Sequence, residues 1–197
     1  MNSSKDKLIW FEKYGIGYYH VKESPYDEDY WNKYVEYEKT EFGKKLNQAR
    51  VDIVNKYRWS ALIDIGIGSG AFIKEFENAF GFDINPVAVK WLKEEKKFSE
   101  PRKVDAMTFW DSLEHIHNAE PILNNIKNYA FVSCPIYKDR EHIFRSKHFR
   151  PDEHCWYFTD LGIVNFMGNY GFTLIESSNI ESKLGREDIK SYVFRKL

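Results

Sequence analysis

Leu62-Ile63-Asp64-Ile65-Gly66-Ile67-Gly68-Ser69-Gly70 is the stretch that decides the fold. A short apolar run over 61–65 leads directly into closely spaced glycines, which is typical of a buried parallel strand followed by a tight turn. Glycines suit such a turn because they tolerate unusual dihedral angles and let a ligand lie against bare backbone. The helix expected over 71–78 would present its positive N-terminal end to that ligand. The stretch therefore predicts a ligand-binding strand–turn–helix unit.

The rest of the chain alternates strands with helices. The pattern predicts further strands over 79–84, 104–111, 129–135, 172–177 and 189–196, and helices over 28–43, 44–57, 86–98, 118–127 and 160–170. The segment before Pro25 is expected to be irregular, and 137–158 is expected to be a long polar loop. This order predicts an α/β fold with a mostly parallel sheet, covered by helices on both faces and ending in an antiparallel hairpin. We divide the chain into an N-terminal helical, tyrosine-rich cap, 1–58, and one compact ligand-binding unit, 59–197.

The composition bounds the classes of protein that need consideration. The chain has 197 residues, of which 43% are hydrophobic and 30% charged, which is typical of one globular domain. A formal net charge of -1 gives no overall attraction to nucleic acid or anionic membranes, although a local basic patch stays possible. No apolar run approaches the roughly 20 residues that span a bilayer, and the N-terminus lacks signal-peptide features. With two cysteines, Cys134 and Cys155, no disulfide framework is expected, which favours a cytoplasmic location.

The glycines alone leave two classes of cofactor open. Gly66, Gly68 and Ala71 also fit the looser dinucleotide pattern, in which alanine replaces the third glycine. Asp64 favours a different cofactor, because a carboxylate gains nothing beside two phosphates but stabilises an ammonium or a sulfonium. Asp83 ends the next strand and could accept ribose hydroxyls in either class. Asp83 could instead help to cap the helix that begins near Asn85, and both roles can coexist.

Several segments together resemble the class I S-adenosylmethionine-dependent methyltransferases. Residues 62–70 resemble the first motif of that family, and Gly-Phe-Asp-Ile-Asn at 81–85 resembles the acidic end of its second strand. Asp-Ser-Leu-Glu-His at 111–115 resembles the corresponding segment of the branch that includes the quinone-biosynthesis O-methyltransferases. His-Phe-Arg-Pro at 148–151 and the Gly-Phe pair at 171–172 also resemble that branch. The resemblance covers about residues 60–197 and rests on the combination of these segments.

This resemblance implies a Rossmann-like fold, with S-adenosylmethionine as cofactor and S-adenosylhomocysteine as product. The cofactor-binding residues that it implies are Asp64, Gly66, Ile67, Gly68 and Gly70 at the methionine end, Asp83 and Ile84 at the ribose, and Asp111, Ser112 and Leu113 beside the methionine. The short interval between Asp83 and Val104 leaves no room for the family's third strand beside a helix. Without the acidic residue of that strand, adenine would be held by apolar and backbone contacts or covered by the N-terminal aromatic segment.

Methyl transfer from a sulfonium is a direct displacement, so the protein mainly aligns the reactants and, where needed, removes a proton. The candidate catalytic residues lie in loops after strands and are Glu114, His115, His148 and His154. Glu114 and His115 could equally orient loops or cap a helix. Candidate substrate contacts are Tyr19, Tyr30 and Arg150. His142, His148, His154 and Cys155 match no structural zinc spacing, so no metal is expected there.

These features predict methyl transfer to a small or medium-sized acceptor, with oxygen favoured and the tyrosine-rich segment acting as a lid. A nucleic-acid or protein methyltransferase is an alternative, and its basic face would come from the loop over 138–150. The chain lacks the Asn/Asp-Pro-Pro-Tyr/Phe motif of enzymes that methylate flipped bases, and 111–114 stands in its place, which argues against that alternative. A catalytically inactive cofactor-binding relative is a third possibility. The oligomeric state is left open.

Overall fold

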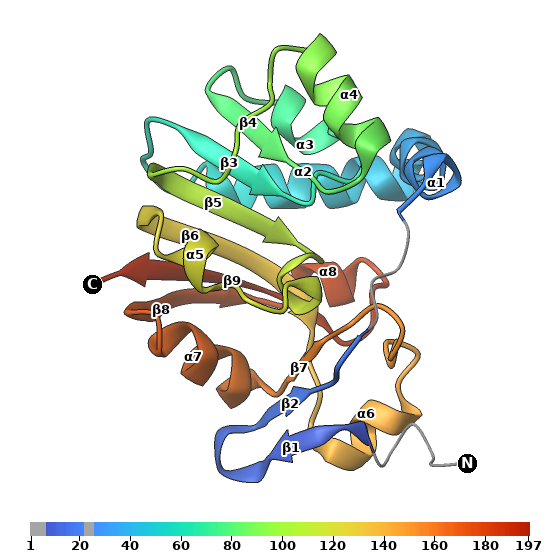
Figure 1. Cartoon of the computed structure of the whole chain (residues 1–197), viewed down its shortest axis with the longest axis vertical. Helices are drawn as coiled ribbons and strands as arrows, with labels where there is room; N and C mark the ends of the chain where they lie inside the picture. The colour runs from blue at the N-terminus through green and yellow to red at the C-terminus, as the bar shows by residue number, and fades with distance from the viewer. Residues whose placement is uncertain (1–6, 22–25) are drawn as a thin grey trace.

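A computed structural model of the chain describes residues 7–21 and 26–197. Its main feature is a six-stranded sheet with the strand order β4-β3-β5-β6-β9-β8 (Figure 1). The strands in chain order are β3 (Leu62–Ile65), β4 (Ala79–Phe82), β5 (Val104–Trp110), β6 (Ile126–Pro135), β8 (Phe172–Ser178) and β9 (Ile189–Lys196). β4, β3, β5 and β6 are parallel, whereas β9 runs antiparallel to both β6 and β8. The predicted Rossmann-like α/β fold with its C-terminal antiparallel hairpin is therefore confirmed.

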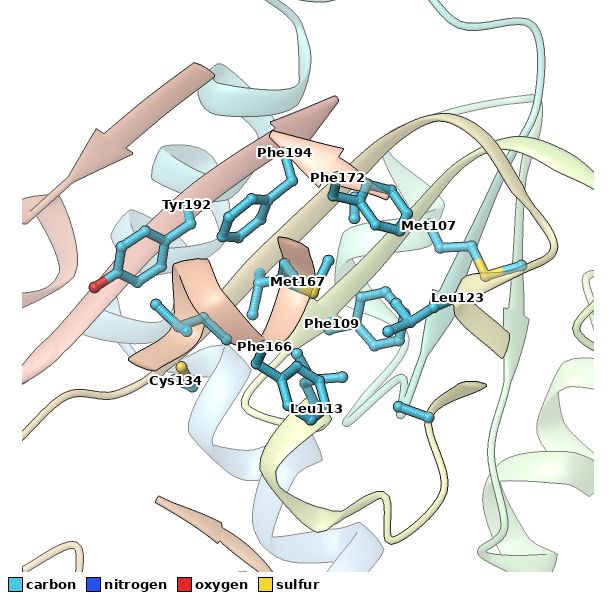
Figure 2. Packing of buried hydrophobic residues seen from close by; sticks show 14 of the residues in the cluster. Met107, Phe109, Leu113, Leu123, Cys134, Phe166, Met167, Phe172, Tyr192 and Phe194 are labelled. Carbon is cyan, nitrogen blue, oxygen red and sulfur yellow. The ribbon is translucent and has the colours of Figure 1, made fainter. Parts of the chain in front are cut away.

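Helices cover both faces of this sheet. They are α1 (Glu28–Lys39), α2 (Glu41–Val54), α3 (Ala71–Lys74), α4 (Pro86–Glu94), α5 (Glu120–Leu123), α6 (Arg140–Arg145), α7 (Asp160–Gly168) and α8 (Ile180–Lys183), with short 3-10 helices η2 (Glu12–Tyr14) and η3 (Leu113–His115). Neighbouring residues of one strand point to opposite faces. Leu62 accordingly packs with α2, α3 and α4, while Ile63 packs with α5 and α7. Figure 2 shows the second of these cores, where Phe166 and Met167 of α7 lie against Phe109 and Tyr192 of the strands.

The family's third strand is missing, as the interval after Asp83 predicts. After α4 the chain enters β5 beside β3, so β4 forms the edge of the sheet. Where a further strand would lie, Gly81 makes a single parallel bridge to Phe98. Its N–H donates to the carbonyl of Lys97 at 2.8 Å and its carbonyl accepts from Ser99 at 3.0 Å. The segment 97–99 thus hydrogen-bonds to the backbone of the edge strand β4 at Gly81.

The N-terminal segment is not irregular, which corrects the expectation from the sequence. β1 (Ile9–Phe11) and β2 (Ile16–Tyr18) form a hairpin, and β2 pairs with β7 (Trp156–Phe158) in a separate three-stranded sheet. β7 and α6 both lie in the stretch expected to be a loop. Strands of three residues carry too little periodicity to be recognised, and the partners are far apart in sequence. Residues 22–25, which also belong to the segment expected to be irregular, lie outside the described residues.

The first long helix ends earlier than predicted. Thr40 separates α1 from α2 and caps α2, because its hydroxyl accepts the N–H of Gly43 at 3.0 Å. Gly43 therefore lies inside the second helix, where the backbone of Tyr37 packs against it too closely for a side chain. At the other end of α1, the Asp27 carboxylate accepts the N–H of Tyr30 at 2.9 Å, as expected for a cap. In Figure 1, α1 lies beside α4, whereas β1 and β2 lie beside α6 and β7.

None of the helices in the described part of the chain is long and apolar enough to cross a membrane.

Candidate active site

A cavity of about 830 Å³ opens where the parallel strands end. Its walls come from α1, from the glycine turn after β3, from the ends of β4 and β5, and from the segment between β6 and α7. Open α/β sheets bind ligands at this edge, and the volume lies in the range of roughly 300–1,000 Å³ that is usual for ligand sites. The cavity is therefore the candidate active site.

The glycine turn forms the floor of the cavity. Gly66 has a φ of +78° and Gly68 a φ of +55°, which are left-handed conformations that L side chains rarely adopt. A Cβ on Gly66 would lie 2.8 Å from the Cβ of Ser112, whereas one on Gly68 would face the ring of Tyr34 at 3.7 Å. Gly66, Ile67 and Gly68 all line the cavity. Bare backbone thus faces the space between the turn and α1.

Gly70 differs from the other two glycines of the turn, and its contact with the cofactor stays a prediction. It has a φ of +78° and precedes α3, but the indole of Trp91 packs against it and it does not line the cavity. The glycine at this position serves the turn and the packing of α4 on the turn.

Asp64 lies at the end of β3 with 1% of its surface exposed, and it lines the cavity. The hydroxyl of Thr108 on the neighbouring strand donates to its Oδ1 at 2.6 Å. Burial raises the pKa of Asp64 to about 7. The hydrogen bond from Thr108 and the charge of Arg50 lower the pKa, but burial outweighs them. Asp83 adds a further small rise in the pKa. A nearby cation would stabilise the ionised form.

Asp83 joins the glycine turn to the start of α4. Its Oδ2 accepts the N–H of Ile67 at 2.9 Å and its Oδ1 accepts the N–H of Asn85 at 2.8 Å. The capping side chain of α4 is that of Asn85, which accepts the N–H of Val87 at 2.9 Å. Burial raises the pKa of Asp83 despite these bonds. Each carboxylate oxygen retains a lone pair for a ligand, and the neighbouring Ile84 lines the cavity with 70% of its surface exposed.

Asp111 follows β5 and belongs to a partly buried network of four charges, of which Glu181 is fully buried. It has a φ of +56°, and its Oδ2 accepts from Arg50 at 2.7 Å and from Arg186 at 2.8 Å. Both guanidiniums also pair with Glu181, which is fully buried on α8. Burial disfavours the charge of Asp111, but the guanidiniums of Arg186 and Arg50 outweigh it and hold the pKa of this carboxyl well below its usual range. The network fixes Asp111 at the wall of the cavity.

Sequence reasoning missed three members of this network, namely Arg50, Arg186 and Glu181. Arg186 and Glu181 carry no motif, and they lie in a part of the chain distant from Asp111. Arg50 offered one signal, because it lies four residues after Leu46 and four before Val54, on the apolar face of α2. A cation on such a face is expected to be paired.

The two residues after Asp111 differ in position. Ser112 lines the cavity, and its Oγ is buried without a hydrogen-bond partner among the described residues. Leu113 is fully buried in the core beneath η3 and does not line the cavity. The side chain of Leu113 thus packs in the core, and its contact with the cofactor stays a prediction.

Three of the four candidate catalytic residues come together at the wall of the cavity. Ligand atoms of Glu114, His115 and His154 all lie within 4.8 Å of one another, and the rings of His115 and His154 meet edge to face at 4.7 Å. The N–H and the thiol of Cys155 both donate to the carbonyl of Glu114, at 2.9 and 3.1 Å. Because β2 pairs with β7 directly after Cys155, the N-terminal hairpin helps to hold His154 against η3.

Burial governs the protonation of this cluster. It raises the pKa of Glu114 well above its ordinary value, with the charge of Asp111 adding to the effect. It lowers the pKa of His115, whose Nδ1 lies 3.0 Å from the carbonyl of Glu153, and it lowers the pKa of His154 further. Burial thus favours the neutral form of the carboxyl and of both imidazoles.

His148 lines the same cavity but stands apart from this group. Its Nε2 lies 2.8 Å from the carbonyl of Glu187, and burial lowers its pKa. Its own carbonyl accepts the hydroxyl of Tyr137 at 3.0 Å.

The candidate substrate contacts divide in the same way. Tyr30 and Arg150 line the cavity, and Arg150 pairs with Glu153 at 3.1 Å. Tyr19 is buried with Tyr157 in a separate core and does not line the cavity, and its contact with the substrate stays a prediction. One face of α1 and the residues before it carry the tyrosines that do line it, which are Tyr26, Tyr30, Tyr34 and Tyr37. Their spacing of three or four residues places them on one side of the helix.

Comparison with known proteins agrees with this geometry. Residues 33–177, well over half of the chain, match the model of a methyltransferase-domain family. No curated protein sequence matches the chain.

The fold is shared with solved methyltransferases. A magnesium protoporphyrin IX methyltransferase from Synechocystis, with bound S-adenosylhomocysteine, is 13% identical and superposes with a TM-score of 0.59 over 86% of this chain and 94% of that one. A possible histamine N-methyltransferase from Thermotoga maritima is 12% identical, with a TM-score of 0.60 over 86% and 98%. The N-methyltransferase NodS from Bradyrhizobium japonicum is 13% identical, with a TM-score of 0.56 over 81% and 98%. The acceptors in these names differ, and at such identities the likeness concerns the fold.

A six-stranded sheet of this order, a glycine turn with acidic strand ends and the family match over residues 33–177 lead to one conclusion: the chain belongs to the methyltransferase-domain family and is an enzyme of the methyltransferase class.

Proposed function

We propose that this methyltransferase transfers the methyl group of S-adenosylmethionine to an oxygen atom of a small or medium-sized acceptor inside the cavity. S-adenosylmethionine is the cofactor and S-adenosylhomocysteine the product. The observation that carries the proposal is that a single cavity joins the glycine turn, with Asp64 and Asp83, to the cluster of Glu114, His115 and His154.

The residues of the first half of the cavity suit this cofactor. Asp64 is a buried carboxylate that gains a counter-charge from the methionine ammonium. The backbone of Gly66 and Gly68 faces the cavity without side chains, so the methionine part can lie close to it. Asp83 has lone pairs left for the ribose hydroxyls beyond its two backbone hydrogen bonds. The bound cofactor supplies an activated methyl group on its sulfonium.

Adenine lies, in this proposal, against the exposed Ile84 at the edge of the sheet. The third strand that would flank the base is missing, and Tyr26 before α1 borders this part of the cavity instead. The side-chain amide of Asn85 donates to the carbonyl of Asp27 at 3.0 Å, which ties α1 to the β4–α4 turn. Burial raises the pKa of Tyr26 to about 12, with Glu153 and Asp83 contributing, so this phenol stays neutral beside the ribose carboxylate. The part of the N-terminal segment from Tyr26 through α2 thus acts as a cap over the cofactor.

The acceptor occupies the other half of the cavity. Tyr30 and Tyr34, whose hydroxyls lie 3.2 Å apart, form one wall, and Arg150 lies in the segment opposite. Direct displacement needs the acceptor atom, the methyl carbon and the sulfur in line, which rigid aromatic walls favour. A hydroxyl acceptor must also lose its proton, and the neutral imidazoles of the cluster can receive it. This requirement is the reason for favouring oxygen.

The charge of the basic loop supports a small acceptor over nucleic acid. Arg140 pairs with Glu141 at 3.7 Å, and Lys147 pairs with Glu187 at 3.5 Å. Together with the pair of Arg150 and Glu153, these contacts reduce the local positive charge that a phosphate backbone would need.

Two measurements test the proposal. Calorimetric titration with S-adenosylhomocysteine should show saturable binding, with NAD as the control that should not bind. Transfer of radiolabelled methyl groups is then measured on matched pairs of hydroxyl and amine compounds of the same ring skeleton. Turnover restricted to the hydroxyl member supports the proposal. Binding of NAD in place of S-adenosylhomocysteine, or turnover restricted to the amine member, would overturn it.

A further inference from the structure

We propose that Glu114, His115 and His154 form a binding site for a first-row transition-metal dication at the acceptor end of the cavity. One carboxylate and two imidazoles are a ligand set that Zn²⁺, Fe²⁺, Co²⁺ and Mn²⁺ bind, whereas Mg²⁺ and Ca²⁺ prefer all-oxygen sites. Ligands about 2.1 Å from one shared ion lie roughly 3–4 Å apart. The three ligand atoms already lie within 4.8 Å of one another. Side-chain movements of about an ångström would bring them to the separation that one shared ion requires.

Polar atoms without partners point to a missing ligand at this place. Both carboxyl oxygens of Glu114 and the Nδ1 of His154 are buried without a hydrogen-bond partner in the described part of the chain. Glu114 is 2% exposed and His154 is 4% exposed. Buried polar groups are normally satisfied, and a group of them that faces a cavity needs an explanation such as an ion. A cation held between them would satisfy them together.

The surroundings hold the ligands in the orientation that a metal needs. The Nδ1 of His115 lies 3.0 Å from the carbonyl of Glu153, so a proton on Nδ1 leaves the lone pair on Nε2 free. Imidazoles that bind metals usually donate their other N–H to a carbonyl or carboxylate in this way. Cys155 is not a ligand here, because its thiol donates to the carbonyl of Glu114 at 3.1 Å. That bond instead fixes the distance between Glu114 and His154.

The site has the form of a catalytic metal centre. Structural zinc sites are closed by four protein ligands, whereas catalytic sites have three and leave a position for water or substrate. Glu114, His115 and His154 all line the cavity, so the remaining positions face the acceptor. Of the four residues whose spacing matched no zinc site in the sequence, only His154 belongs to this cluster. His142 instead lies against Asp188, and His148 lies against Glu187. Metal binding as such does not rest on methyl transfer.

The test uses the full chain after removal of metals with EDTA. Titration with Co²⁺ is followed by visible d–d absorption, and titration with Zn²⁺ by calorimetry. We expect one equivalent of metal per chain, with binding at least roughly 100-fold weaker in Glu114→Gln and in His154→Gln. His117→Gln is the matched control, because it removes an exposed imidazole whose ring lies 5.8 Å from that of His20. This variant should bind as the native chain does.

Circular dichroism confirms that each variant is folded, and His115→Gln replaces either variant that is not. The proposal is overturned if neither ion binds saturably up to millimolar concentration, if binding survives in the cluster variants, or if it is lost in His117→Gln. S-adenosylhomocysteine is titrated into the same samples. In the native chain, absence of metal binding with intact cofactor binding rejects the metal site alone. Absence of cofactor binding with intact metal binding rejects the proposed function alone.

Discussion

Asp64 is expected to make cofactor affinity depend on pH. The carboxyl is buried, and its pKa of about 7 in the free protein means that it is half protonated at neutral pH. The ammonium of S-adenosylhomocysteine favours the ionised form, so binding below pH 7 must expel a proton from Asp64. Affinity should therefore rise as the pH increases through 7 and level off near pH 8.

The size of the effect follows from the fraction of protein with ionised Asp64. That fraction is about nine-tenths at pH 8 and about one-tenth at pH 6, so the apparent Kd should be roughly tenfold higher at pH 6. This corresponds to about 1.4 kcal/mol. The assay is calorimetric titration with S-adenosylhomocysteine from pH 6 to pH 8 in two buffers of different ionisation enthalpy, which also counts the protons released.

Asp64→Asn is the variant that isolates this carboxyl, because the amide oxygen can still accept the hydroxyl of Thr108. It should bind with an affinity independent of pH in this range, and at pH 8 more weakly than the native chain by about 1.5–3 kcal/mol, the value of a charge-assisted hydrogen bond. The lowered pKa values of His115, His148 and His154 place their titration at the acid end of the range or below it. A flat profile in the native chain, or a slope that survives in Asp64→Asn, would refute the reasoning.

Three further outcomes are expected. Asp83→Ala should weaken binding of S-adenosylhomocysteine by about 1.5–3 kcal/mol for each ribose hydrogen bond lost, and unchanged affinity by calorimetry would exclude the ribose role. Arg50→Ala leaves the fully buried carboxylate of Glu181 with one partner fewer and should lower the free energy of unfolding in urea by about 3 kcal/mol. Lys44→Ala, which breaks an exposed ion pair with Glu41, is the control and should change it by about 0.5 kcal/mol or less. Gly66→Ala, at a φ of +78° and in contact with a neighbouring loop, should cost about 1–2 kcal/mol and also weaken cofactor binding. Gly168→Ala, where a Cβ would meet nothing within 4 Å, should leave cofactor binding unchanged and raise the thermal midpoint or keep it constant; a lower midpoint there would contradict this account.

Much of the parallel sheet was predictable because its signals are local. Each buried strand is a short apolar run, and the glycine turn at 66–70 and the Asn85-Pro86 helix start are read from neighbouring residues. Chain length alone predicted the loss of a strand after Asp83, since 20 residues hold a helix but no additional strand with its crossover. The family resemblance at 62–70 and 111–115 added the class of enzyme.

The residues of the cavity were predictable only where they follow a strand directly. Asp64, Asp83 and Asp111 meet because the carboxyl ends of parallel strands share one edge of the sheet. Gly70 and Leu113 belong to the same sequence motifs as the residues that line the cavity. Gly70 nevertheless packs against Trp91, and the side chain of Leu113 points into the core. A motif marks a segment of chain, whereas the direction of each residue is set by the packing around it.

The sequence by itself determined the class of fold, the glycine turn and the acidic strand ends of this methyltransferase, because each depends on residues close together in the chain. Only the tertiary structure decided which distant groups meet. Arg50 reaches Asp111 from α2, and His154 reaches Glu114 because the short β2 strand pairs with β7. Such contacts form when burial of apolar surface brings remote segments together, and buried charges and imidazoles must then find partners among whatever lies beside them. No local pattern records that choice, so the four-charge network and the histidine–carboxylate cluster became visible only in the folded chain.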